Sequence, residues 1–135
     1  MNAMKKILLS VIMVFLMTSC ATTVKFPVSN AAPSADIIAK IKKDKQNNFE
    51  VLIVANYLAA AERLSPPKKT YVVWIENKEN GINNIGQLKS ENAKKTKLKT
   101  LTPFRPLEIF ITPEDEGNVT FPSGIEISRV VLERH

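Results

Sequence analysis

The stretch Thr70-Tyr71-Val72-Val73-Trp74-Ile75 decides the fold of this chain. Five consecutive apolar residues run from Tyr71 to Ile75, and all five are β-branched or aromatic. Residues of this kind favour an extended, pleated backbone. Because successive side chains of a strand point to opposite faces, both faces of this strand are apolar and both must be covered. The stretch therefore predicts a strand in the middle of a sheet rather than at its edge.

Short strand patterns continue on both sides of this stretch. We expect six further strands, at residues 36–43, 49–58, 82–88, 94–101, 106–112 and 125–132. Asn80-Gly81 has the composition of a tight hairpin turn, and Gly86 is a candidate β-bulge. A helix is conceivable for residues 36–43, and one helical turn for residues 59–64, before Pro66-Pro67. About seven short strands with no long helix predict an all-β, two-sheet antiparallel sandwich.

Two side-chain patterns within these strands suggest surfaces. Lys95, Lys97 and Lys99 alternate with less polar residues, which predicts a solvated edge strand, with a basic binding stripe as the alternative. In 106–112, Phe110 should point away from the sandwich core that holds Ile109 and Ile111. With Tyr71 or Tyr57, an exposed Phe110 would form an aromatic patch able to grip a peptide or a sugar. We favour the simpler interpretation, that these rings contact the loop at 59–69.

The N-terminal segment resembles a bacterial lipoprotein signal peptide. Lys5-Lys6 precede a ten-residue apolar run, residues 7–16, which ends in Met17-Thr18-Ser19-Cys20. Such a run fits a signal peptide and is shorter than the roughly 20 residues that span a bilayer. The resemblance implies that residues 1–19 are removed and that Cys20 is acylated. A secretory signal without lipidation is the alternative. We expect an anchored lipoprotein on the outer membrane facing the periplasm, with the membrane as partner through acyl chains on Cys20.

The rest of the chain should divide into two parts. Residues 20–33 read as the lipidated cysteine and a tether, disordered to about Asn30, and residues 34–135 as the sandwich domain. The alternative is that Phe26-Pro27-Val28 docks as a first, irregular edge segment. Removing Lys5 and Lys6 lowers the formal net charge from +6 to +4, and the remaining lysines are scattered. We therefore expect no nucleic-acid partner. Cys20 is the only cysteine, so the fold must be stable without an intrachain disulfide.

The residues that catalysis requires are scarce. His135 is the only histidine and the last residue, so no Ser-His-Asp or Cys-His site is expected, nor a zinc site. Glu114-Asp115-Glu116 reads as a solvated acidic loop rather than a calcium loop. Glu108 and Glu126 could form a glycosidase-type pair only if their strands are neighbours, and the simpler interpretation is a solvent-facing sheet surface. We expect a protein that is not an enzyme and has no cofactor and no metal.

A family resemblance covers residues 71–124. Its motifs are Tyr-Val-Val-Trp-Ile at 71–75, Asn-Ile-Gly-Gln-Leu at 84–88, Thr-Pro-Phe at 102–104, Phe-Ile-Thr-Pro-Glu at 110–114 and Pro-Ser-Gly at 122–124. Together they resemble the extracytoplasmic domain of anti-sigma-K factors, also shared by small uncharacterised bacterial lipoproteins. The resemblance implies an immunoglobulin-like β-sandwich of about seven strands. We interpret its residues as architectural, in a structural motif made of Trp74, Gly81, Gly86, Pro122 and Gly124.

These observations favour a lipid-anchored binding or interaction module of the cell envelope. Its partner would be an envelope protein or a glycan. The alternative is an extracytoplasmic sensor or regulatory domain related to anti-sigma factor signalling. Anti-sigma activity itself is not expected, because in that family it depends on a cytoplasmic sigma-binding domain that has no counterpart in this sequence. Fold-level likeness alone is a weak guide to activity.

Overall fold

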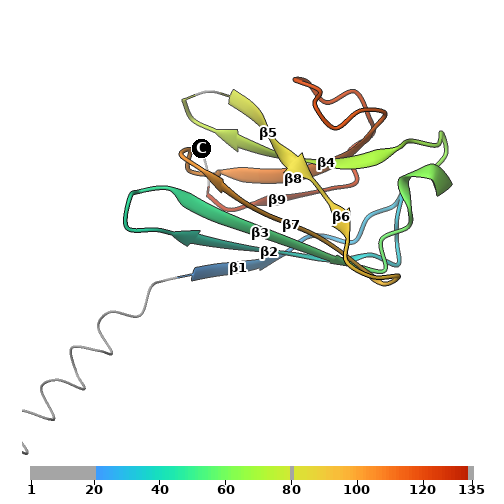
Figure 1. The fold of residues 1–135 in the computed structure, drawn as a ribbon, viewed down its shortest axis with the longest axis horizontal. Helices are drawn as coiled ribbons and strands as arrows, with labels where there is room; N and C mark the ends of the chain where they lie inside the picture. The colour runs from blue at the N-terminus through green and yellow to red at the C-terminus, as the bar shows by residue number, and fades with distance from the viewer. Residues whose placement is uncertain (1–20, 80, 134–135) are drawn as a thin grey trace, which may run out of the picture.

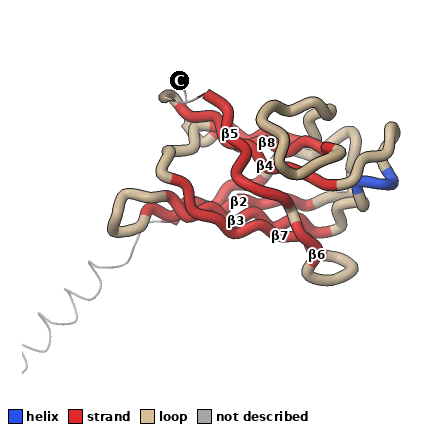
Figure 2. Tube along the Cα trace, turned by 45° about the horizontal axis from the view of Figure 1, so that its top comes forward, coloured by secondary structure: helices blue, strands red, loops and turns tan. Residues whose placement is uncertain are grey.

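The computed structural model describes residues 21–79 and 81–133. The described residues form nine strands and one short 3-10 turn, η1 (Figure 2). Their bounds are β1 Ala21–Lys25, β2 Asp36–Lys43, β3 Phe49–Asn56, η1 Ala61–Arg63, β4 Thr70–Asn77, β5 Gly81–Gln87, β6 Lys89–Ser90, β7 Lys95–Thr102, β8 Glu108–Glu114 and β9 Ser128–Val131. The strand expected at 36–43 is confirmed over the helix, and the helical turn expected near 59–64 is η1.

The strands form two antiparallel sheets packed face to face. One sheet has five strands in the order β1-β2-β3-β7-β6, and the other has four in the order β5-β4-β8-β9. Figure 1 shows them as two layers, with β4, β5, β8 and β9 above β1, β2 and β3. The expected all-β, two-sheet architecture is confirmed. The described part of the chain has nine strands rather than seven, because β1 and the two-residue β6 have too little apolar alternation to be recognised.

Strand β4 has the central place that its sequence predicts. It is paired on both sides, with β5 and with β8. Val73 and Ile75 point between the sheets, and Val72 and Trp74 point to the other face, yet all four side chains are fully buried. The apolar residues on the two faces of β4 thus belong to two separate clusters, the main core between the sheets and a smaller cluster on the outer face of the four-stranded sheet.

The candidate bulge at Gly86 is confirmed. Val73 pairs with Gly86 while the next residue, Trp74, pairs with Asn84, so Ile85 is the extra residue. Gly86 has a φ of +135°, which is sterically accessible to glycine and strained for other residues. A β-carbon there would also lie 2.9 Å from Leu98 Cδ1. Gly81 begins β5 with a φ of +71°, as expected after a tight turn, whereas Asn80 lies outside the described residues.

Two strands differ from their sequence predictions. The lysine-bearing β7 is an edge strand over only part of its length, because β6 pairs with it at Thr96 and Lys97 on the side away from β3. The last strand is shorter than expected: β9 begins at Ser128, and Ile125 is 68% exposed. Alternating apolar residues at 125, 127 and 131 resemble a strand, but only Ile127 of these reaches the core.

Residues 21–33 belong to the folded domain, so the prediction of a disordered tether is wrong. Ala21–Lys25 forms β1 and pairs with β2 along its whole length. Phe26 and Ala32 are buried in the main core. The Ala- and Thr-rich composition of this segment resembles that of a linker. The segment is nevertheless ordered, because residues 21–25 pair with β2 as a strand.

The signal segment, Cys20 and His135 lie outside the described residues. Within the described part of the chain, no helix has the length and apolar character needed to cross a membrane.

Candidate functional site

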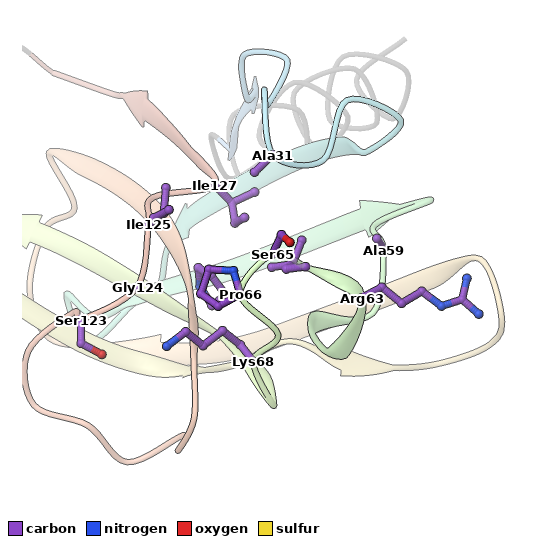
Figure 3. A pocket seen from close by; sticks show the side chains of 12 residues that line it. Ala31, Ala59, Arg63, Ser65, Pro66, Lys68, Ser123, Gly124, Ile125 and Ile127 are labelled. Carbon is purple, nitrogen blue, oxygen red and sulfur yellow. The ribbon is translucent and has the colours of Figure 1, made fainter.

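A pocket opens at one end of the sandwich, between the β3–β4 connection and the segment that leads into β9. Its volume is about 410 Å³, within the roughly 300–1,000 Å³ typical of ligand sites. The lining residues are Ala31, Ala59, Arg63, Leu64, Ser65, Pro66, Lys68, Pro113, Ser123, Gly124, Ile125 and Ile127. We call this cavity the end pocket (Figure 3).

The walls of the end pocket are largely apolar. Ile127 and Ala31 lie on one side and Pro66 on the other. Lys68 extends toward Ser123, whereas the Arg63 guanidinium points away from Pro66 (Figure 3). The Lys68 ammonium is paired with Asp115 at 3.6 Å. The pocket therefore offers apolar contact area with a neutralised charge at its rim.

One wall of the pocket is held by a buried carboxylate. Glu114 ends β8, and its side chain is excluded from solvent. Its oxygens accept hydrogen bonds from the Ser123 and Gly124 backbone N–H groups at 3.0 Å and 3.2 Å, and from the Ser123 hydroxyl. The Thr112 hydroxyl donates another, at 2.5 Å. The prediction that Glu114 belongs to a solvated acidic loop is therefore wrong, although Asp115 and Glu116 are exposed as expected.

These donors keep Glu114 ionised. Burial alone would raise the pKa of Glu114, but hydrogen bonds from the Ser123 and Thr112 hydroxyls and from two backbone N–H groups outweigh it. The pKa of Glu114 consequently lies below its ordinary value of 4.5. An ionised carboxylate with several donors holds the Ser123–Gly124 turn firmly against β8, because hydrogen bonds to a charged group are stronger than those between neutral groups.

The network extends from Glu114 to Trp74. The Trp74 indole N–H donates to the Thr112 hydroxyl oxygen at 2.8 Å, which satisfies its one polar group. Trp74 does not lie between the sheets, where an immunoglobulin-type tryptophan would be expected. It packs on the outer face of the four-stranded sheet with Val72, Phe110 and Val119. Because both faces of β4 are apolar, the sequence did not reveal which face was the inner one.

The outer tryptophan is covered by neighbouring side chains and by the loop that follows β8. The Trp74 and Phe110 rings are stacked, with centroids 6.2 Å apart. The Arg129 guanidinium lies 4.1 Å from the centre of the Phe110 ring. Asn84 donates to the carbonyl oxygens of Gly117 and Val119, which ties the loop to β5.

Gly124 is required for close approach. A β-carbon at this position would lie 1.9 Å from the Pro113 carbonyl oxygen, so a larger residue would push the turn away from β8. The turn Pro122-Ser123-Gly124 thus packs directly against the strand that carries Glu114. Trp74 and Gly124 of the sequence motif are joined through this network, while Gly81 and Gly86 serve the β4–β5 hairpin.

The two carboxylates considered as a glycosidase-type pair both contact one arginine. Arg129 lies 2.7 Å from Glu126 and 3.5 Å from Glu108, and also 3.2 Å from Glu76. The hydrogen bonds that Arg129 donates to Glu126 are the main cause of the raised pKa of Arg129, assisted by the charges of Glu126 and Glu108. This cluster covers Phe110 and places three carboxylates around one guanidinium. Among the described residues, no cluster of three or more His, Cys, Asp or Glu side chains is arranged to hold a metal ion.

The aromatic patch considered from the sequence does not form around Phe110, although Tyr57 is 60% exposed. Phe110 faces away from Ile109 and Ile111 as predicted, but it is buried. Tyr71 is also buried, and its hydroxyl donates to the Ala59 carbonyl oxygen at 2.5 Å. That contact with the 59–69 loop is the simpler interpretation favoured from the sequence. Burial raises the pKa of Tyr71 to about 12, with a smaller contribution from Glu62.

Other apolar side chains are exposed in the connections that line the end pocket. Phe121 is 78% exposed and precedes the Pro122-Ser123-Gly124 turn, and Val28 is 74% exposed in the same connection as Ala31. Ile125 both lines the pocket and is largely exposed. Phe121 was not predicted to be exposed. Its position in a polar loop, directly before Pro122, was the feature of the sequence that indicated exposure.

Comparisons with protein-family models, with curated proteins and with solved structures found no match to this chain.

Substituting Glu114 tests the network that holds the pocket wall. We expect Glu114→Gln to lower the free energy of unfolding by about 2 kcal/mol at pH 7, because an amide cannot replace a charge that accepts several hydrogen bonds. Since the pKa is lower in the folded state, the carboxylate stabilises the fold above pH 4.5, and this stabilisation is lost as the pH falls through the folded pKa. The difference between wild type and variant should therefore shrink on acidification.

Urea unfolding over a range of pH measures this difference. Glu116→Gln is the matched control, because Glu116 is exposed two residues away, and its effect should stay within about 0.5 kcal/mol. Equal stability of Glu114→Gln and wild type at pH 7 would contradict the assignment.

Proposed function

We propose that this chain is a lipid-anchored, non-enzymatic binding module of the cell envelope, with the end pocket as its recognition site. The observation that carries the proposal is a pocket of about 410 Å³ with apolar walls, one of which is fixed by the buried Glu114. A rigid apolar cavity suits recognition because little conformational freedom is lost on binding.

We further propose that the sandwich is of the immunoglobulin-like type. Strands β2, β3, β7 and β6 lie in one sheet, opposite β5, β4, β8 and β9 in the other. This order corresponds to the A-B-E-D and C′-C-F-G sheets of that fold, with β1 added at one edge. The position of Trp74 on the outer face departs from the usual pattern. In this fold class, loops at one end of the sandwich commonly carry recognition.

The position of β1 supports an anchor at Cys20. Ala21 begins β1 and pairs with Lys42, at the end of the sandwich opposite to the end pocket. Figure 1 places the start of β1 at the left and η1, beside the pocket, at the right. A lipid on the preceding residue, Cys20, would thus leave the pocket open. Two or three acyl chains would suffice for stable anchoring.

The exposed residues around the pocket favour an apolar segment of an envelope protein as the ligand. Ile125 lines the pocket, and Val28 and Phe121 are exposed in the connections that also supply the lining residues Ala31 and Ser123. Clusters of exposed apolar side chains beside a cavity are typical of protein interaction sites. A sensor or regulatory role would use the same site, with a transmembrane signalling protein as the partner.

The anchor has a direct chemical test. We expect the mature protein extracted from membranes to begin at Cys20 and to carry the mass of its acyl chains. A Cys20→Ser variant should lose that mass, while its thermal unfolding stays unchanged because the described strands begin at Ala21. Intact-mass spectrometry is the measurement. An unmodified Cys20, or cleavage at another residue, would refute lipidation.

The recognition site can be tested in intact cells with a photo-crosslinking amino acid. At Ile125, inside the pocket rim, we expect one dominant adduct with an envelope protein. At Ile82, which is similarly apolar and 41% exposed on β5, we expect none. A partner with a transmembrane signalling architecture would favour the sensor role. The same adducts from both positions, or none from Ile125, would contradict a recognition site at the end pocket.

A further inference from the structure

The outer face of the five-stranded sheet is rich in lysine. Buried residues alternate along β2 and β3, which places the intervening side chains on the outside, and the strand register extends this face to β1, β7 and β6. We call this surface the lysine face. Its lysines are Lys25, Lys40, Lys42, Lys89, Lys95, Lys97 and Lys99.

Carboxylates neutralise only part of this charge. On the lysine face, Asp36 pairs with Lys25 at 3.5 Å and Glu50 pairs with Lys99 at 3.4 Å. Beyond the strand ends, Glu91 pairs with Lys97 at 3.5 Å. The other lysines of this face, which are Lys40, Lys42, Lys89 and Lys95, have no carboxylate partner within the described part of the chain. The face therefore carries a net positive charge on a sheet.

Aliphatic side chains lie between the lysines. Ile38 and Leu101 are exposed, and Leu52 and Val54 are half-buried in the centre of the sheet. A surface that mixes ammonium groups with aliphatic side chains suits the headgroup region of a membrane. There the ammonium groups can pair with anionic headgroups while the aliphatic parts of the lysine side chains contact the acyl chains. The opposite outer face differs, because Val119 and Arg129 cover its aromatic residues.

The proposed anchor lies at the margin of the lysine face. Ala21 and Thr23 of β1 belong to this face through their pairing with Lys42 and Lys40. Cys20 directly precedes Ala21 in the sequence, so a lipid on Cys20 would be attached next to the first residue of β1. With residues 21–33 folded rather than acting as a tether, an acylated Cys20 would hold β1, and the lysine face beside it, close to the bilayer.

We propose that the lysine face docks on an anionic phospholipid surface, so that the sandwich lies with its five-stranded sheet against the membrane. This proposal uses the proposed anchor to explain orientation in the cell, while the attraction itself depends only on the lysine face. Each lysine near an anionic membrane strengthens binding roughly fivefold, and salt weakens that attraction. In this orientation the end pocket remains open at the side of the domain.

Vesicle binding of the unacylated protein tests the proposal. The chain from residue 20 onward, with Cys20→Ser, keeps all the described strands. It is mixed with vesicles of phosphatidylglycerol and phosphatidylcholine in equal parts, or of phosphatidylcholine alone, and co-sedimentation is measured. We expect binding to the anionic vesicles that decreases with salt and little binding to the neutral ones.

Two triple variants with the same net charge locate the surface. Lys40→Gln, Lys42→Gln and Lys95→Gln together should weaken binding to anionic vesicles by roughly a hundredfold. The control combines Lys45→Gln, Lys69→Gln and Lys78→Gln, and it should retain most of the binding. These three lysines are exposed, lie outside the lysine face and have no carboxylate partner among the described residues. Thermal unfolding should show that both variants remain folded.

The outcomes separate this proposal from the proposed anchor. No binding to anionic vesicles, or equal losses in the two variants, would overturn docking through the lysine face even if Cys20 proves to be acylated. Selective loss in the first variant supports the docking surface even if Cys20 proves to be unmodified. Binding to lipopolysaccharide or an anionic glycan, without binding to phospholipid vesicles, would also overturn the proposal.

Discussion

The buried carboxylate of Glu114 is the constraint on which the loop end of this sandwich depends. A charge removed from water is costly unless donors surround it, and here the donors come from Thr112 on the same strand and from Ser123 and Gly124 in the following loop. The loop must therefore return to β8 for the charge to be tolerated. A single side chain thus converts a polar, glycine-containing segment into a fixed wall.

Two regions of the domain depend on this constraint. Through Thr112, the same network provides the hydrogen-bond acceptor for the indole N–H of Trp74, on the outer face of the four-stranded sheet. Through Ser123 and Gly124, it shapes the end pocket. The two outer faces of the sandwich consequently differ in character. One is covered by a loop and by Arg129 over an aromatic pair, and the other presents lysines and aliphatic side chains to the surroundings.

Local patterns predicted the parts of the fold that depend on local chemistry. The apolar run at 71–75 correctly indicated a central strand, and Gly86 correctly indicated a bulge. Pairing across the chain was harder to predict: residues 21–25 form a strand only because β2 lies beside them. The burial of Glu114 could not be predicted from the adjacent residues, because its backbone hydrogen-bond donors, Ser123 and Gly124, lie nine and ten residues further along the chain. The end pocket combines three connections distant in sequence, and no local motif marks it.

Amide hydrogen exchange at Ser123 and Gly124 measures the central interaction most directly. If Glu114 holds this turn, both amides should be strongly protected at neutral pH, unlike the amides of the exposed residues Glu116 and Asn118 in the same loop. Their protection factors should fall once the pH drops well below 4.5, as the carboxylate becomes protonated. Protection no greater than that of Glu116 and Asn118 at neutral pH would contradict the role assigned to Glu114.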